Sequence, residues 1–127
     1  MPKTLASWTE HLPRWIPRSL SDLYGPREGV VDLPLDLCWS GHTRYDVGRF
    51  RQRVALYNLV IVQGLQDHYP AFLNSDHLID AWPLLHRRMA DGYVKAWESR
   101  FPELARRGAS PEAFAAARAE WEAATWA

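Results

Sequence analysis

The sequence predicts a mainly α-helical domain, of α+β class, with a short β ribbon near residues 30–39. Two hydrophobic patterns support this fold class. Apolar side chains alternate from Val31 to Trp39, which is the period of a strand with one buried face. Between Phe50 and Ile61 apolar side chains recur every three or four residues, which is the period of a helix. Helix-start signals further along the chain favour helices there as well.

Length and composition indicate a single domain of ordinary globular type. The chain has 127 residues, of which 47% are hydrophobic and 24% charged, so it can bury a core and is not of disordered composition. We divide it into an N-terminal arm (1–24), a body (25–108) and a C-terminal helix (109–127). A formal charge of zero argues against a protein that coats nucleic acid by charge alone, although it permits a local basic patch.

The sequence also bears on the compartment. The single cysteine, Cys38, excludes an internal disulfide and fits a reducing environment. The chain has no run of about 18 apolar residues that would span a membrane, and its N-terminal residues show no signal-peptide core. We therefore expect a cytoplasmic protein without a membrane partner.

Prolines shape the arm and the ribbon. Pro13 and Pro17 interrupt the arm, so we expect only a short helix near residues 5–12 and a helical turn over residues 19–24. Pro34 cannot donate a ladder hydrogen bond, which predicts an edge strand or a strand that breaks at this proline.

A helix is expected after the ribbon. Asp46 can cap a helix that starts near Val47 and ends near Gln63, with Gly64 as its C-terminal cap. Its polar side is predicted to carry Arg49, Arg51 and Arg53. Alternate residues of a helix point about 200° apart, so these arginines are not expected to form one nucleic-acid-binding patch.

Two short helices are predicted next. The first covers residues 65–73. Ser75 is expected to cap the second, over residues 76–82, which Pro83 ends or kinks. Residues 84–90 are then expected to form a loop or a further turn.

The C-terminal part is predicted to contain a helix over residues 91–100, a closing segment over 103–108 and a final helix. Ser110 is the expected cap of the final helix and Pro111 occupies its first position. Alanine-rich spacing favours continuation of this helix to near Thr125.

Tryptophan is over-represented, with seven residues in a short chain. We expect Trp39, Trp82 and Trp97 to be buried where the strand pattern meets the helix pattern. Their predicted neighbours in the core are Leu37, Phe50, Val54 and Tyr57. The remaining tryptophans are too numerous for all of them to be hidden, and aromatic side chains are enriched at binding surfaces.

Metal binding is not predicted. His77 and Asp80, or His42 and Asp46, are spaced to share a helix face, but the sequence contains no cysteine pair and no histidine-rich zinc motif. We therefore predict no metal and no other cofactor.

Catalysis is a remote alternative. A small hydrolase would use Cys38 or Ser40 as the nucleophile with His42 as the base and Asp46 to orient it. Closeness in the sequence does not create that geometry, so we predict no catalytic residue and no enzyme.

DNA binding is the second hypothesis. The short helices predicted over 65–73, 76–82 and 91–100 are spaced as in a helix-turn-helix regulator. Basic residues that would contact phosphates are Arg87, Arg88 and Lys95. Against this hypothesis, the helix over 91–100 carries apolar residues typical of a core.

Short motifs follow one another between about residues 30 and 105. They are Leu33-Pro34, Trp39-Ser40-Gly41, Tyr45-Asp46, Arg53, Leu56-Tyr57, Gly64, Phe72-Leu73, Leu78, Trp82-Pro83, Ala96-Trp97-Glu98 and Phe101-Pro102-Glu103-Leu104. Their order resembles a family of small actinobacterial proteins that look like companions of nucleotidyltransferase-type toxins. The resemblance implies an antitoxin-like protein and implies no catalytic residue. The chain departs from the family pattern in its tryptophan-rich arm and over residues 84–92.

The first hypothesis is therefore a non-enzymatic protein-interaction module, in concrete form an antitoxin-like inhibitor of a nucleotide-handling enzyme. A protein is the expected partner and nucleic acid the alternative. The arm and the ribbon edge are the predicted binding surface, because apolar residues of a proline-broken arm need a surface to cover them and an edge strand can accept another strand. The predicted partner-binding residues are Trp8, Trp15, Ile16, Leu35 and Tyr45.

Overall fold

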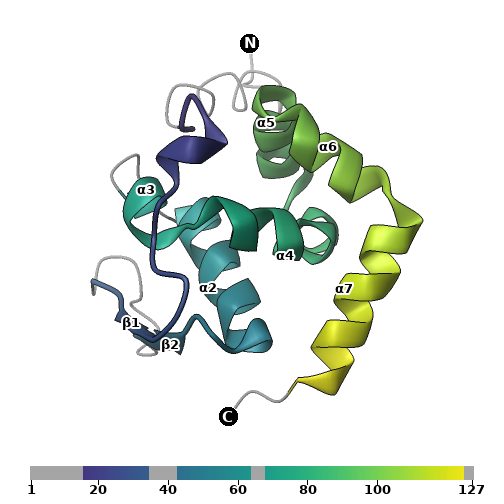
Figure 1. Cartoon of the computed structure of the whole chain (residues 1–127). Coiled ribbons are helices and arrows are strands. Elements are labelled where there is room, and N and C mark those ends of the chain that lie inside the picture. Colours follow the sequence, from purple (N-terminus) through teal and green to yellow (C-terminus); the bar gives the residue numbers. More distant parts are fainter. Residues whose placement is uncertain (1–15, 35–42, 64–67, 125–127) are drawn as a thin grey trace.

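The computed structural model describes residues 16–34, 43–63 and 68–124, and it forms a mainly helical fold with a small antiparallel sheet (Figure 1). The predicted fold class is thus confirmed. The elements in chain order are a 3₁₀ turn, η2 (Leu20–Asp22), the strands β1 (Val30–Asp32) and β2 (Arg44–Asp46), and the helices α2 (Phe50–Gln63), α3 (His68–Phe72), α4 (Ser75–Arg88), α5 (Asp91–Arg100), α6 (Pro102–Ala109) and α7 (Pro111–Ala123).

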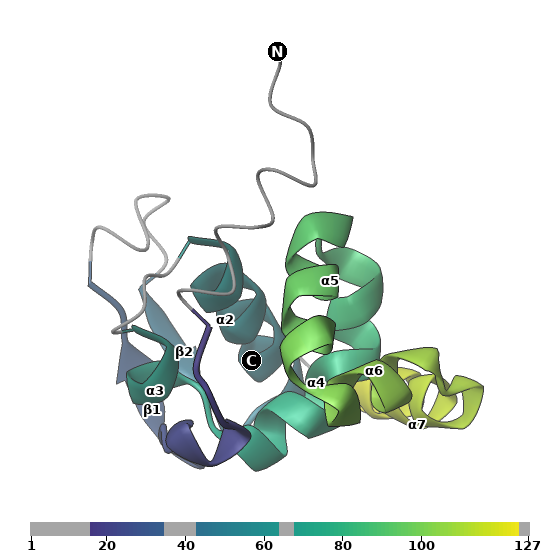
Figure 2. The same cartoon turned by 90° about the horizontal axis from the view of Figure 1, so that it is seen from above.

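Helix α4 is the centre of the arrangement. It packs against α2, α6 and α7, while α5 packs against α6. The ribbon of β1 and β2 lies at the opposite side of α2 from α6 and α7 (Figures 1 and 2). No helix of the described ranges is both long and apolar enough to cross a membrane.

The ribbon pairs Val31 with Tyr45, and both of these side chains are buried. Strand β1 ends at Asp32, two residues before Pro34, as the predicted break near this proline allows. Residues 35–39 of the predicted ribbon lie outside the described residues. The backbone hydrogen bonds that flank β1 and β2 join Val47 N–H to the Gly29 carbonyl at 2.9 Å and Leu33 N–H to the Thr43 carbonyl at 2.8 Å.

Helix α2 begins at Phe50, three residues later than expected. The Asp46 carboxylate accepts a hydrogen bond from Gly48 N–H at 2.9 Å, and the Asp46 carbonyl accepts one from Arg49 N–H at 3.1 Å. Asp46 therefore stabilises a turn that leads into the helix and does not cap the helix directly.

Helix α4 continues through Pro83 to Arg88, so the predicted end of this helix and the predicted loop over residues 84–90 are wrong. Proline lacks the N–H that would bond the carbonyl four residues earlier, which here belongs to Ile79. Arg107 Nε of α6 donates to that carbonyl at 3.2 Å. Neighbouring α6 thus supplies the donor that Pro83 lacks.

Of the other cap predictions, one is confirmed and one is wrong, while the predicted cap at Gly64 lies outside the described residues. The side chain of Asn74, and not that of Ser75, caps α4 by accepting from Asp76 N–H and His77 N–H. Ser110 caps α7 as predicted, and its hydroxyl accepts from Ala113 N–H at 3.1 Å. Helix α6 is a whole helix over the segment that was expected only to close the body.

The predicted core is confirmed for those of its residues that the structure describes. Trp82 and Trp97 are buried together with Phe50, Val54 and Tyr57, while Leu37 and Trp39 lie outside the described residues. The Trp82 indole N–H donates to Glu98 Oε2 at 2.8 Å, so its burial leaves no unpaired donor.

A strand-like contact ties the end of the arm to the body. Gly25 N–H donates to the Leu73 carbonyl at 2.8 Å, and Ser75 N–H donates to the Leu23 carbonyl at 3.1 Å. Asn74 Nδ2 adds a hydrogen bond to the Gly25 carbonyl at 3.3 Å. This contact places the loop that follows Gly25 against the first turn of α4, where the candidate site lies.

Candidate functional site

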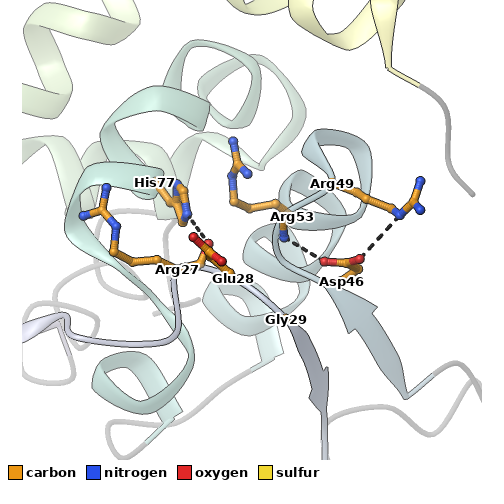
Figure 3. Close-up of a pocket in the computed structure, with 8 residues that line it drawn as sticks. Arg27, Glu28, Gly29, Asp46, Arg49, Arg53 and His77 are labelled. Atoms are coloured by element: carbon orange, nitrogen blue, oxygen red, sulfur yellow. Dashed lines mark hydrogen bonds and ion pairs between the residues drawn. The ribbon is translucent and has the colours of Figure 1, made fainter.

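An open pocket of about 580 Å³ lies between the loop before β1, the turn before α2 and the first turn of α4 (Figure 3). Three separate parts of the chain build it. The residues that line it are Arg27, Glu28, Gly29, Asp46, Gly48, Arg49, Arg53 and His77.

The loop side of the pocket is shaped by backbone contacts. Gly29 has a φ of 91°, a conformation that glycine adopts more readily than other residues, and it turns the chain into β1. His77 Nε2 lies 2.8 Å from the Arg27 carbonyl, so the first turn of α4 holds the loop in place. An exposed ion pair of 2.6 Å between Arg27 and Asp76 reinforces this junction.

Arg53 lies between the His77 side and the Arg49 side of the pocket (Figure 3). Its side chain is only 6% exposed, so the prediction that it sits on the polar side of its helix is wrong. Arg53 Nη1 donates to the Val47 carbonyl at 2.8 Å, and Nη2 lies 3.4 Å from Asp80 Oδ2. Among the buried side-chain polar atoms of the described residues, Arg53 Nε alone has no hydrogen-bond partner.

Carboxylates from two helices compensate the buried charge of Arg53. Asp80 is on α4, and Glu120 Oε2 of α7 lies 4.0 Å from Arg53 Nη2. Partial burial raises the pKa of Glu120, the nearby negative charge of Asp80 raises it further, and the Arg53 guanidinium opposes both effects. Arg53 thus joins α2 to both α4 and α7.

A second, shallower groove of about 320 Å³ adjoins the pocket and shares Asp46 and Arg49 with it. Its lining is Val30, Arg44, Tyr45, Asp46, Arg49 and Gln52. We call the pocket and this groove together the ribbon surface. Val30 is 58% exposed, and it and Tyr24 are the large apolar side chains most exposed to solvent among the described residues.

One edge of the ribbon is open in the described part of the chain. The flanking hydrogen bonds use Gly29 and Leu33, so the N–H and C=O groups of Val30 and Asp32 point away from β2. The sheet of the described residues contains only β1 and β2, and no third strand pairs with this edge there.

The ribbon surface combines charges of both signs with one exposed apolar side chain. Arg49 Nε lies 3.4 Å from Asp46 Oδ2, and Arg44 Nε lies 3.0 Å from Asp32 Oδ1. The described lining residues of the pocket include no serine, threonine or cysteine that would act as a nucleophile. Within the described ranges no group of three or more histidine, cysteine or acidic residues is arranged to hold a metal ion.

The structure separates the residues predicted to bind a partner. Tyr45 lines the groove but is only 7% exposed, and Ile16 is a core residue that is 4% exposed, so neither presents a broad free surface as expected. Ile16 is buried because the end of the arm packs onto the body. Trp8, Trp15 and Leu35 lie outside the described residues, as do Cys38, Ser40 and His42.

Sequence reasoning missed the pocket, although one signal was present. Arg53 lies three residues after Phe50 and four residues before Tyr57, so it falls in the same helical stripe as both. A charged residue within an apolar stripe indicates a buried, paired charge. Nothing in the sequence indicated that Arg27 and His77, fifty residues apart, would meet there.

No family model matches the chain, and comparisons with curated proteins and with solved structures likewise give no match.

Proposed function

We propose that this protein is a non-enzymatic interaction module that binds a protein partner through the ribbon surface. The observation that carries the proposal is the exposed Val30, which is surrounded by charged residues and lies on a strand with an open edge. An apolar centre with a polar rim is the usual anatomy of a protein interface. A strand of the partner would extend the sheet at this edge.

The mixture of charges favours a protein over nucleic acid at this surface. The lining of the pocket has three arginines but also Glu28 and Asp46. A nucleic-acid backbone offers only negative charge and gains little from a surface whose charges nearly balance, whereas a protein presents both signs.

Arg53 would add a specific contact. Its buried Nε lacks a hydrogen-bond acceptor, and Arg53 lines the pocket. This atom is shielded from solvent, so an oxygen of the partner would bond it only after the Arg53 side chain had shifted towards the pocket. A hydrogen bond to a charged group typically contributes about 1.5–3 kcal/mol.

The concrete form of the proposal is an antitoxin-like inhibitor of a nucleotide-handling enzyme. This form rests on the resemblance of the sequence to companions of nucleotidyltransferase-type toxins, and it names the class of partner to test first. The product of the gene adjacent to the one that encodes this chain is the natural candidate.

The experiment mixes the full chain with that gene product and measures binding by calorimetry. Val30→Asp places a charge at the centre of the proposed interface, and we expect it to weaken binding by about 2 kcal/mol, or roughly thirtyfold. Ala115→Asp makes the same charge change at an exposed position of α7 and should leave the affinity unchanged.

Either of two results would contradict the ribbon surface as the interface. One is that the Val30→Asp variant binds as tightly as the unaltered chain. The other is that Val30→Asp and Ala115→Asp weaken binding equally. A chain that failed to bind this protein but bound duplex DNA with a steep salt dependence would favour the helix-turn-helix alternative instead.

A further inference from the structure

A second pocket, of about 440 Å³, lies where α7 packs on α2 and α4, away from the ribbon surface. Four arginines gather in it around two aromatic rings. Its lining is Arg51, Leu84, Arg87, Arg88, Phe114, Arg118, Trp121 and Glu122. We call it the arginine pocket. Although the whole chain is neutral, this lining carries four positive charges against one negative charge.

Aromatic rings hold three of the guanidinium groups in place. The guanidinium carbon of Arg87 lies 3.8 Å from the ring centre of Phe114. Those of Arg88 and Arg51 lie 4.2 Å and 5.0 Å from the ring centre of Trp121. Cation–π contacts of this kind restrict the side chains without neutralising their charge, so the positive groups are arranged before a ligand arrives.

The arginines differ in their remaining contacts. Arg51 Nε donates to the Trp121 carbonyl at 2.8 Å, and Arg118 Nε donates to Glu122 Oε1 at 3.0 Å. Arg87 and Arg88 are exposed, and within the described residues neither makes an ion pair with a carboxylate. Their N–H groups are thus available to an anion from outside.

We propose that the arginine pocket binds the phosphodiester backbone of a single-stranded nucleic acid, with Arg87 and Arg88 as the principal phosphate contacts. Arginine offers several N–H donors in a planar fork that matches phosphate oxygens. Its plane also provides a surface on which an unpaired base can stack. The single acidic side chain of the lining, Glu122, is occupied by Arg118, so it does not oppose a polyanion.

The length of the cluster favours a strand over an isolated phosphate. Phe114 and Trp121, which hold Arg87 and Arg88, are seven residues apart on α7. At 1.5 Å per residue they are separated by about 10 Å along the helix axis. A span of about 10 Å is larger than one phosphate group, so it can accommodate more than one phosphate of a strand.

The proposal differs from the helix-turn-helix alternative in the surface that it uses. A recognition helix over residues 91–100 would enter a duplex groove, but α5 buries Val94 and Trp97 in the core. Lys95 of that helix does not line the arginine pocket. The pocket is instead built from the C-terminal half of α4, one side of α7 and Arg51 of α2.

The test measures the affinity of the full chain for a fluorescently labelled oligothymidylate strand by anisotropy at several salt concentrations. We expect Arg87→Gln and Arg88→Gln each to weaken binding about three- to tenfold. Each should also lower the slope of log affinity against log salt by about 0.7, the value for one lost contact to a single strand. The matched control is Arg106→Gln, an exposed arginine of α6 outside the pocket, which should change neither quantity.

Melting midpoints show whether a variant loses binding merely because α7 is displaced. If a glutamine variant has a lowered midpoint, the lysine variant at the same position is tested in its place. Arg87→Lys and Arg88→Lys keep the positive charge, so we expect them to keep the salt slope. The proposal is overturned by an unaltered chain that shows no salt-dependent binding, by an equal effect of Arg106→Gln, or by loss of slope in the lysine variants.

Competitors distinguish the strand from other anions. An excess of unlabelled strand should displace the label at concentrations at which inorganic phosphate, thymidine monophosphate and poly-glutamate do not. Equal competition by either phosphate compound would indicate a site for a single phosphate, and equal competition by poly-glutamate would indicate an acidic protein segment. Both results contradict a strand-specific site.

Discussion

At the scale of single residues, buried polar side chains join the parts of this fold. Tyr57 on α2 shows how. Its hydroxyl oxygen accepts a hydrogen bond from Asn74 N–H at 2.9 Å, and Asn74 in turn caps α4 and bonds the Gly25 carbonyl. One phenol thereby links α2, the start of α4 and the end of the arm.

Burial of Tyr57 predicts a loss of stability at alkaline pH. Desolvation raises the pKa of its hydroxyl from 10.0 to about 12, although the Asn74 N–H and nearby arginines favour the charged form. Because the folded pKa is the higher one, the unfolded chain releases this proton first. The contribution to stability is therefore complete below pH 10 and falls between about pH 10 and 12, by roughly 2–3 kcal/mol.

Denaturant titrations across this pH range check the alkaline prediction. Tyr57→Phe should be less stable at neutral pH, because Asn74 N–H loses its acceptor, but its stability should decline less steeply above pH 10. Tyr69, whose pKa burial also raises to about 12, remains in that variant and accounts for the residual decline. If the unaltered chain and Tyr57→Phe lost stability equally steeply above pH 10, the alkaline decline could not be assigned to Tyr57.

At the scale of elements, α4 contains Pro83, which leaves the Ile79 carbonyl without a donor from within the helix. The helix continues because Arg107 of α6 donates to the Ile79 carbonyl, the acceptor that Pro83 leaves unbonded. The stability of the second half of α4 thus depends on its neighbour α6. Local reasoning expected Pro83 to end or kink the helix, because the sequence near Pro83 does not reveal the donor on α6.

A double-mutant cycle measures this coupling. Arg107→Ala should destabilise the chain by about 1 kcal/mol, because it leaves the Ile79 carbonyl without a donor. In a Pro83→Ala background the N–H of Ala at position 83 can bond the Ile79 carbonyl. Arg107→Ala should therefore lower the free energy of unfolding markedly less in that background. Unfolding of the four proteins in urea gives the coupling free energy, and a value near zero would show that the Arg107 contact does not compensate Pro83.

At the scale of the whole molecule, close backbone packing and a shared aromatic core hold the elements together. Gly25 crosses the α3–α4 junction so closely that a Cβ atom on it would lie 2.7 Å from the Phe72 carbonyl carbon and 2.8 Å from the Leu73 amide nitrogen. Trp97 of α5 packs edge-on against Tyr69 of α3, with ring centres 5.3 Å apart.

Gly25→Ala should therefore destabilise the fold by about 1–3 kcal/mol, as overpacking against backbone atoms does. Gly48→Ala is the matched control, because its Cβ would meet only the Asp46 carboxylate, at 3.2 Å. Chemical denaturation of both variants provides the comparison. Equal stability of the Gly25 and Gly48 variants would show that the arm contact tolerates a side chain.

Trp97→Ala tests the aromatic core. We expect a loss of about 3–5 kcal/mol, the usual cost of truncating a large buried aromatic side chain. The measurement is the thermal midpoint compared with that of Phe114→Ala, whose ring is only partly buried and should matter less. An unchanged midpoint for Trp97→Ala would refute the core described above.

Much of the fold was predictable because local patterns control it. The stripe of Phe50, Val54 and Tyr57 predicted α2, and the cap at Ser110 predicted the start of α7. The candidate sites were less predictable. Arg53 could have been recognised as buried from its place in the apolar stripe, but the meeting of Arg27 with His77 arises from contacts between distant parts of the chain.

The sequence by itself determined the helical class, the starts of α4, α5 and α7 and several aromatic residues of the core, since hydrophobic period and capping act over a few neighbouring residues. The tertiary structure alone decided that α4 passes through Pro83 and that Asp80 and Glu120 compensate the buried charge of Arg53. It also decided that four arginines gather around Phe114 and Trp121. Each of these outcomes depends on a partner supplied by another element, because a buried carbonyl or charge is stable only where such a partner compensates it.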